Sequence, residues 1–162
     1  MISCTKRIEF DAAHRIPNHA GKCRMLHGHR YVVEASFVAK PVVMVNDEKS
    51  VKLTTVQQLN SMGMVVDFAC IKKLLGTWID QNWDHNTILS EEDRAFGFSI
   101  EQYTGQRVFY MDCYPTTENL SNFLLDKVCP QLFREQKVIC NKVRLYEGSS
   151  SYCDALSSSI LG

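Results

Sequence analysis

Histidine is concentrated in one short stretch of this chain, and its spacing there indicates a metal site. Four of the five histidines fall within residues 14–31, whose sequence is HRIPNHAGKCRMLHGHRY. His14 has the parity of the apolar residues before it in a predicted strand, and His27 and His29 share one face of the next predicted strand. Paired antiparallel, these strands can aim three imidazole nitrogens at one ion and leave a fourth tetrahedral position open, as in catalytic zinc sites.

A less specific interpretation of the same residues stays open. HGH can be a turn with solvated histidines, and His14 can simply end its strand, because a short motif is only a hypothesis.

Cys23 lies four residues before His27, between Lys22 and Arg24. The two cations favour a thiolate, which is a base and a nucleophile. Two alternatives remain: Cys23 is a fourth zinc ligand that closes a structural site, or it is an inert thiol.

Two carboxylate positions further along the chain also carry possible chemistry. In the dipeptide Asp84-His85, the acid can set the histidine tautomer or share a proton relay, although a helix end with a capping Asp gives the same pattern. Glu147 continues the inward parity of Val143 and Leu145, and a buried carboxylate needs donors, which a ligand with two N–H groups would supply. Alternatively, the strand emerges into solvent at this point.

The elements that must position these residues follow from hydrophobic periodicity. The sequence predicts two strands over about 4–14 and 27–39, followed by a weakly structured polar hairpin or loop over 43–62. A helix capped by Asp67 comes next, and a charged loop over 90–107 leads to a strand over 108–111. A second helix, capped by Thr116, ends or kinks at Pro130, and a last strand spans about 141–148. This order favours an α+β domain with two helices on one face of an antiparallel sheet.

The helices are assigned from apolar stripes at helical spacing. The stripe residues are Phe68, Ile71, Leu74, Leu75, Trp78 and Ile79 in the first helix and Leu120, Phe123, Leu124 and Val128 in the second. Glu118, in the first turn of the second helix, is by default a residue that the helix dipole favours there.

Composition limits the classes of function. The 162 residues are 45% hydrophobic, which fits a single domain over residues 1–162, and eighteen acidic residues balance eighteen basic ones. This balance argues against nucleic acid or an anionic membrane as partner and in favour of a small molecule. Seven scattered cysteines and no signal-like or membrane-spanning stretch predict a reducing, cytoplasmic location.

Several separated motifs, taken in order, resemble those of a known enzyme family. They are FDAAHRI, CRMLHGHRY, VVDF, WDHNTI, PTTEN and VRLYEG. Together they are similar to the motifs of the 6-pyruvoyl-tetrahydropterin synthase and 6-carboxy-tetrahydropterin synthase family, which has the tunnelling fold. The departures are the longer segments around 44–62 and 90–107, which touch none of these motifs.

The resemblance implies a role for each matching residue. It implies that a catalytic zinc, Zn2+, is held by His14, His27 and His29. The other implied roles are a catalytic base at Cys23, a relay at Asp84 and His85, a pterin anchor at Glu147, and pocket residues Thr117 and Glu118. A two-point contact of Glu147 with the 2-amino group and N3–H of a pterin would satisfy the need for donors noted above.

The resemblance also implies a substrate and an assembly. The family substrate is 7,8-dihydroneopterin triphosphate, and the short CxxxHGH spacing resembles the bacterial branch that makes 6-carboxy-5,6,7,8-tetrahydropterin and acetaldehyde on the way to queuosine and other 7-deazaguanine nucleosides. The alternatives are a 6-pyruvoyl-tetrahydropterin synthase and, from another class, a zinc-stabilised pterin-binding module without turnover. A homo-oligomer, a hexamer whose sheets join into a β-barrel, is implied as well. Cations near the metal motif that could meet the triphosphate are Arg15, Lys22, Arg24 and Arg30.

Overall fold

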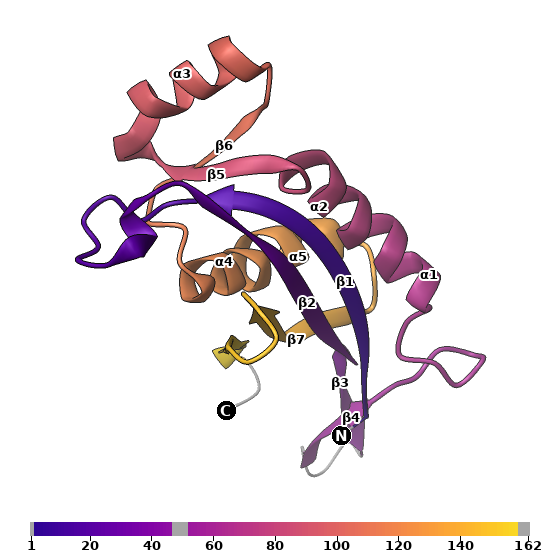
Figure 1. Cartoon of the computed structure of the whole chain (residues 1–162). Coiled ribbons are helices and arrows are strands. Elements are labelled where there is room, and N and C mark those ends of the chain that lie inside the picture. The colour runs from indigo at the N-terminus through magenta and orange to yellow at the C-terminus, as the bar shows by residue number, and fades with distance from the viewer. Residues whose placement is uncertain (1, 47–51, 159–162) are drawn as a thin grey trace.

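Two long strands form the centre of a curved sheet (Figure 1). The computed structural model of the chain describes residues 2–46 and 52–158. Strands β1 (Ser3–His14) and β2 (His27–Ala39) pair antiparallel along their whole length, with His14 opposite His27. Both strands match the predicted ranges closely.

Four shorter strands extend the sheet on both sides. β7 (Val138–Tyr146) and β8 (Tyr152–Leu156) continue it antiparallel beyond β2, whereas β5 (Asn86–Ser90) and β6 (Val108–Met111) run parallel to β1 on its other side. The order is β6-β5-β1-β2-β7-β8, so the sheet is mixed, although its central strands are antiparallel as predicted. β5 pairs with β1 only at the C-terminal end of β1, over residues 12–14. In the described part of the chain, no strand pairs with this edge of β1 over residues 3–10.

Side chains on the two central strands alternate between a covered and an open face. Phe10 and His14 on β1, and Tyr31 and Val33 on β2, are buried on the face that carries the helices. Asp11, at the other parity, points to the opposite face, because successive side chains on a strand alternate. We call these the covered face and the open face of the sheet.

The first predicted helix forms as expected and packs on the covered face. It consists of α1 (Phe68–Ile71), a π-helical turn (Lys72–Gly76) and α2 (Thr77–Asn82). Asp67 caps it, since its Oδ1 accepts a hydrogen bond from the Ala69 N–H at 2.7 Å. The fully buried members of its stripe are Ile71, Leu75 and Ile79, whereas Phe68 is half exposed.

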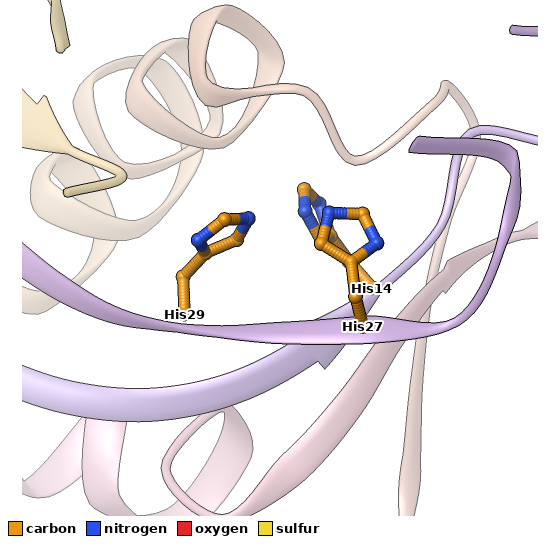
Figure 2. A group of neighbouring side chains, drawn as sticks. All are labelled: His14, His27 and His29. Atoms are coloured by element: carbon orange, nitrogen blue, oxygen red, sulfur yellow. The ribbon is translucent and has the colours of Figure 1, made fainter. Parts of the chain in front are cut away.

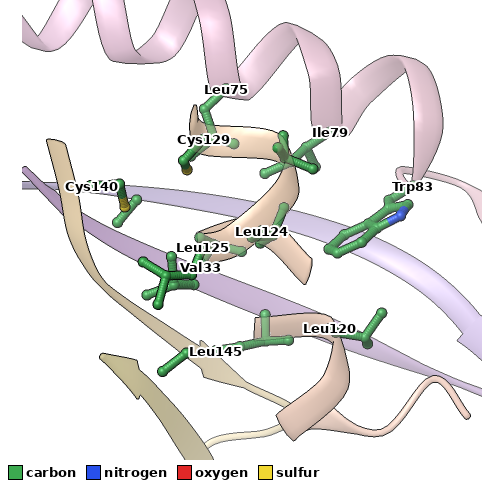
Figure 3. Close-up of a cluster of buried hydrophobic side chains, with 14 of the residues drawn as sticks. Val33, Leu75, Ile79, Trp83, Leu120, Leu124, Leu125, Cys129, Cys140 and Leu145 are labelled. Carbon is green, nitrogen blue, oxygen red and sulfur yellow. The ribbon is translucent and has the colours of Figure 1, made fainter. Parts of the chain in front are cut away.

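The second predicted helix is longer than expected. It consists of α4 (Thr117–Phe123), a π-helical turn (Leu124–Val128) and α5 (Cys129–Leu132), so it continues past Pro130. Pro130 lies in the first turn of α5, where a missing N–H costs little. Both helices and the covered face enclose the hydrophobic core, shown in Figure 3, whose labelled members include Val33, Leu75, Trp83, Leu124 and Leu145.

The charged loop predicted over 90–107 is wrong. A short 3-10 turn (Glu91–Asp93) leads there into helix α3 (Arg94–Thr104), which projects at the β6 end of the molecule in Figure 1. Phe98 and Tyr103 of α3 are exposed and Gly97 is its one buried residue, so the helix adds little to the core, although Phe96, Ile100 and Tyr103 recur at helical spacing. Among the described residues no helix is long and apolar enough to cross a membrane.

One prediction about strands is confirmed and one is wrong. The hairpin alternative predicted over 43–62 is confirmed by β3 (Pro41–Asn46) and β4 (Lys52–Gln57), which pair antiparallel, and residues 47–51 lie outside the described part. The strand predicted over 141–148 begins at Val138 and ends at Tyr146, and it is not the last, because β8 follows it. β8 buries only Ala155, which explains why no hydrophobic pattern indicated it.

Candidate active site

Three histidines converge on the covered face at one end of the β1–β2 pair (Figure 2). The ring centroids of His14 and His27 are 4.6 Å apart, those of His14 and His29 are 5.3 Å apart, and those of His27 and His29 are 4.9 Å apart. One ligand nitrogen from each ring lies within 4.8 Å of the other two. The structure therefore brings together the three ligands that the sequence predicted.

Backbone carbonyls fix which nitrogen of two rings faces the centre. The Nδ1 of His14 donates to the Pro115 carbonyl oxygen at 2.7 Å, and the Nδ1 of His27 donates to the Met25 carbonyl oxygen at 2.7 Å. A carbonyl oxygen only accepts, so Nδ1 carries a proton in both rings, and it is Nε2 that offers a lone pair to a metal when the ring is neutral. The His14 Nε2 is buried and has no hydrogen-bond partner in the described part of the chain.

These residues fit a zinc ion. Three imidazoles are a common zinc ligand set, and here the Nδ1 of two of them is held by a hydrogen bond to a carbonyl. A bound zinc ion would also give the buried His14 Nε2 a partner. Burial lowers the pKa of His29, which keeps its ring neutral and able to bind a metal. Tyr31 packs against two of these rings: its ring centroid is 5.8 Å from that of His14 and 5.7 Å from that of His29.

A carboxylate reaches the histidine centre from the end of β7. The Oε1 of Glu147 is 3.2 Å from the His14 Nε2 and 3.4 Å from the His29 Nε2. The contact with His14 is the main cause that lowers the pKa of Glu147, and a hydrogen bond from Thr117 contributes. Glu147 therefore connects His14 and His29 to Thr117 at the start of α4.

Glu118 and Cys153 lie at the same end of the site. A hydrogen bond from its own backbone N–H lowers the pKa of Glu118, and a hydrogen bond from the Cys153 thiol contributes. Burial, together with Glu118, raises the pKa of Cys153 to about 11. Cys153 was not predicted as a site residue, because it lies on β8, which has no strand signal in the sequence. In the structure it is opposite the buried Leu145 of β7.

Cys23 lies in the loop between β1 and β2, in the 3-10 turn Lys22–Arg24. The turn is fixed to the end of β1, because the Cys23 carbonyl oxygen accepts from the Ile16 N–H at 2.8 Å. Its thiol is exposed and is absent from the group of three ligand atoms. The structure therefore places Cys23 in the loop that leads into His27, outside the group of three ligand atoms.

Asp84 and His85 pair with each other away from the three histidines. The Asp84 Oδ2 lies 2.9 Å from the His85 Nδ1, and the Asp84 Oδ1 accepts from the Asp11 N–H at 2.9 Å. The hydrogen bond to Asp84 raises the pKa of His85, whose side chain is 77% exposed. Burial alone would raise the pKa of Asp84, but the Asp11 N–H and His85 lower it. Asp11, Asp84 and His85 form a separate group at the edge of β1.

The cations predicted near the metal motif divide into two sets. Arg15 makes a bidentate ion pair with the buried Asp93, with both N–O distances 2.9 Å, and Arg30 pairs with Glu9 and Asp11 on the open face. These two arginines already have structural partners. Lys22 and Arg24 are exposed and make no ion pair with any described residue, so they stay candidates for the triphosphate.

The class of protein follows from the fold. A solved structure of an uncharacterised protein from Wolinella succinogenes superposes with a TM-score of 0.72 at 18% identity, covering 97% of this chain and 98% of that chain. The 6-pyruvoyltetrahydropterin synthase of Plasmodium vivax superposes with a TM-score of 0.57 at 16% identity, covering 96% and 98%. At these identities the likeness concerns the fold alone, and it places the chain among tunnelling-fold proteins.

Sequence comparison defines the family. The family model described as 6-pyruvoyl tetrahydropterin synthase matches residues 3–157. Proteins named 6-carboxy-5,6,7,8-tetrahydropterin synthase are 41% identical over 154 residues in Rickettsia bellii, covering 95% of this chain and 99% of that protein, and 29% identical over 150 residues in Bacillus subtilis, covering 91% and 80%. The chain belongs to the 6-pyruvoyl tetrahydropterin synthase family.

Proposed function

We propose that this protein converts 7,8-dihydroneopterin triphosphate to 6-carboxy-5,6,7,8-tetrahydropterin, with release of acetaldehyde and triphosphate, in a zinc-dependent reaction of 7-deazaguanine biosynthesis. The observation that carries the proposal is the convergence of three histidines around the orphaned His14 Nε2. The name shared by the Rickettsia and Bacillus relatives supports the choice of product.

Each group at the site has a chemical task in this proposal. His14, His27 and His29 hold zinc, which when bound polarises the substrate's side-chain oxygens and makes their protons easier to remove. Cys23 moves protons at the substrate as base, and its exposed position in the β1–β2 loop leaves it accessible. Glu147 accepts the paired N–H groups of the pterin ring, with Thr117 and Glu118 beside it.

The Asp84-His85 relay is proposed to serve the pocket of a neighbouring subunit. The pair lies at the edge of β1, in a group separate from the three histidines, and over residues 3–10 this edge pairs with no described strand. An unpaired edge of this length is a template for another copy of the chain. We therefore propose a cytoplasmic homo-oligomer, a hexamer in which joined sheets form a β-barrel and bring Asp84 and His85 to a neighbour's zinc.

The test is to measure zinc content and to analyse the products formed from 7,8-dihydroneopterin triphosphate. We expect about one zinc per chain, and acetaldehyde in equal amount to the pterin product. Metal-stripped protein should be inactive and should recover with zinc, and activity should fall as pH drops through the histidine range, because protonated histidines release the metal. Full activity without metal would contradict the proposal.

The second candidate is a 6-pyruvoyl-tetrahydropterin synthase, which the description of the matching family model favours. This enzyme eliminates triphosphate but releases no acetaldehyde, so the same assay separates the two products. A 6-pyruvoyl product without acetaldehyde would select it.

The candidate from another class is a zinc-stabilised pterin-binding module in which Cys23 closes the coordination sphere. The absence of Cys23 from the group of three ligand atoms argues against it. Cys23→Ala distinguishes the two: the enzyme keeps zinc and loses activity, whereas the module loses zinc and stability.

A further inference from the structure

His85 has a backbone conformation that residues with a side chain rarely adopt. Its φ is 55°, in the left-handed region, and in the described part of the chain it is the one non-glycine residue with a positive φ. In this region the Cβ atom lies close to the following carbonyl oxygen, so the conformation costs free energy and persists only where neighbouring contacts hold it. The imidazole is 77% exposed, so these contacts must be made by the backbone of His85.

The first contacts come from β1. The His85 N–H donates to the Asp11 carbonyl oxygen at 2.7 Å, and the Asp11 N–H donates to the Asp84 Oδ1 at 2.9 Å. One residue of β1 thus holds the Asp84-His85 dipeptide through both of its backbone groups. These bonds use the N–H of His85 but not its carbonyl oxygen.

The His85 carbonyl oxygen receives its donor from Gln106. The Gln106 Nε2 donates to it at 3.0 Å, and the Gln106 Oε1 accepts from the Thr87 hydroxyl at 2.8 Å. A carbonyl oxygen only accepts, so the amide nitrogen must face His85 and the amide oxygen must face Thr87. Because Thr87 is fully buried, its hydroxyl fixes the amide in the orientation that His85 needs.

Gln106 is itself positioned by the end of α3. The helix ends at Thr104 and is capped by Gly105, whose φ of 69° glycine adopts without strain. The Gln106 N–H then donates to the Thr104 Oγ1 at 3.0 Å, and β6 begins two residues later beside β5 (Figure 1). The segment 90–107, which lies outside the family motifs, therefore presents Gln106 to His85.

We propose that Gln106 is a positioning residue of the reaction, which holds His85 in the left-handed conformation that keeps its imidazole against Asp84. This inference rests on the proposed function, because it gives the relay pair a support from outside the family motifs. Without the Gln106 donor, water would replace it at the His85 carbonyl oxygen, and the backbone would relax towards a commoner conformation. The His85 Nδ1, now 2.9 Å from the Asp84 Oδ2, would then leave this carboxylate.

Steady-state kinetics on 7,8-dihydroneopterin triphosphate tests the proposal with two variants of Gln106. Gln106→Leu removes both hydrogen bonds, whereas Gln106→Glu keeps an acceptor for Thr87 but turns a second acceptor towards the His85 carbonyl oxygen. Both should lower kcat about tenfold, because a misplaced proton-transfer group slows the chemical step. KM and zinc content should stay within about twofold of wild type, since Gln106 acts on the relay pair and not on the substrate or the metal.

Gln102→Leu is the matched control, because it removes an exposed amide from the same helix. Its kcat and KM should equal those of the wild type. An unchanged kcat in Gln106→Leu, a rise in KM alone, or an equal loss of kcat in Gln102→Leu would overturn the proposal.

NMR titration of His85 gives a measurement that needs no turnover. In the wild type, the hydrogen bond to Asp84 raises the pKa of His85. In Gln106→Leu, which adds no charge, this pKa should fall towards the ordinary value of about 6.5, and in Gln102→Leu it should keep its wild-type value. An unchanged pKa of His85 in Gln106→Leu would show that the ring stays against Asp84 without Gln106, which would overturn the proposal.

The two proposals fail in different ways. A wild type that binds no zinc and yields no pterin product contradicts the proposed function. A wild type that turns over, while Gln106→Leu matches it in kcat and in the pKa of His85, contradicts only the inference. If Gln106→Leu does not fold by circular dichroism, the nearly isosteric Gln106→Glu decides alone, and a wild-type kcat in that variant is equally decisive against the inference.

Discussion

The covered and open faces of the β1–β2 pair carry two kinds of chemistry. On the covered face, His14 is buried against Tyr31 and its orientation is set by a carbonyl. On the open face, Arg30 bridges Glu9 and Asp11, and all three side chains are at least 38% exposed. Burial and carbonyl contacts fix a metal-binding geometry on the first face, whereas water surrounds the charged groups of the second.

The three histidines and the Asp84–His85 pair differ in how far one chain builds their surroundings. Three ligands for a metal meet within one chain, because two adjacent strands supply all of them. The relay pair is formed, with Asp84 and His85 in contact, but it stands exposed beside Asp11. The covered face holds three close ligand atoms from one chain, whereas the Asp84–His85 pair lies at the edge of β1 where we propose that another copy of the chain binds.

The largest expected effect comes from removing a ligand on the covered face. His27→Ala should lower activity by about 10³-fold or more, because in the proposed reaction a bound zinc would contribute several kcal/mol and each 1.4 kcal/mol is tenfold in rate. The His27 ring is partly exposed, so the variant should fold. Zinc content and turnover on the same sample check the prediction, and a zinc-free variant with wild-type turnover would contradict it.

The relay pair should give the next largest effect. Asp84→Asn should lower turnover by about 10²-fold, because it weakens the orientation and charge stabilisation of a proton-transfer group, and it should leave zinc content unchanged. Loss of zinc from this variant would show that the two regions are not independent.

Mixing two inactive variants tests whether neighbouring subunits share a pocket. Oligomers refolded from equal amounts of His27→Ala and His85→Ala chains should recover roughly a quarter of wild-type activity, because some pockets combine an intact centre with an intact pair from another subunit. No recovery in verified mixed oligomers would place the whole site within one chain.

The histidine centre could be predicted from sequence because its signals are local. The parity of His14 on one strand and of His27 and His29 on the next fixes their common face once the strands pair. The caps at Asp67 and Thr116 are likewise read from one or two residues, and both are confirmed.

Features that depend on distant parts of the chain escaped prediction. The Pro115 carbonyl that orients His14 is 101 residues away in sequence, and Arg15 meets Asp93 across 78 residues. The five residues of β5 are all buried, so they show no alternation of polar and apolar side chains, and α3 buries only Gly97, so its weak stripe is not matched by burial. These elements are specified by tertiary contacts, which no local pattern records.

A smaller expected effect is the pH dependence of the unfolding free energy that the Asp84–His85 pair contributes. Asp84 raises the pKa of His85, so their ion pair stabilises the folded protein below the ordinary histidine pKa of about 6.5, and this stabilisation is lost as pH rises through the raised value. The unfolding free energy of wild type relative to His85→Ala should therefore fall over this pH range. NMR titration of His85 should show its pKa decrease in Asp84→Asn, and an unchanged value would contradict the pairing.

The smallest expected effect compares two helix caps, one near the histidine centre and one remote from it. Thr116 Oγ1 accepts from the Asn119 N–H at the start of α4, and Asp67 caps α1 in the same way. Thr116→Ala and Asp67→Ala should each cost about 1 kcal/mol of unfolding free energy, which urea titration measures. Only Thr116→Ala should also raise KM, because Thr117 and Glu118 follow it directly and Thr117 contacts Glu147. Equal changes in KM would mean that the start of α4 does not position the substrate.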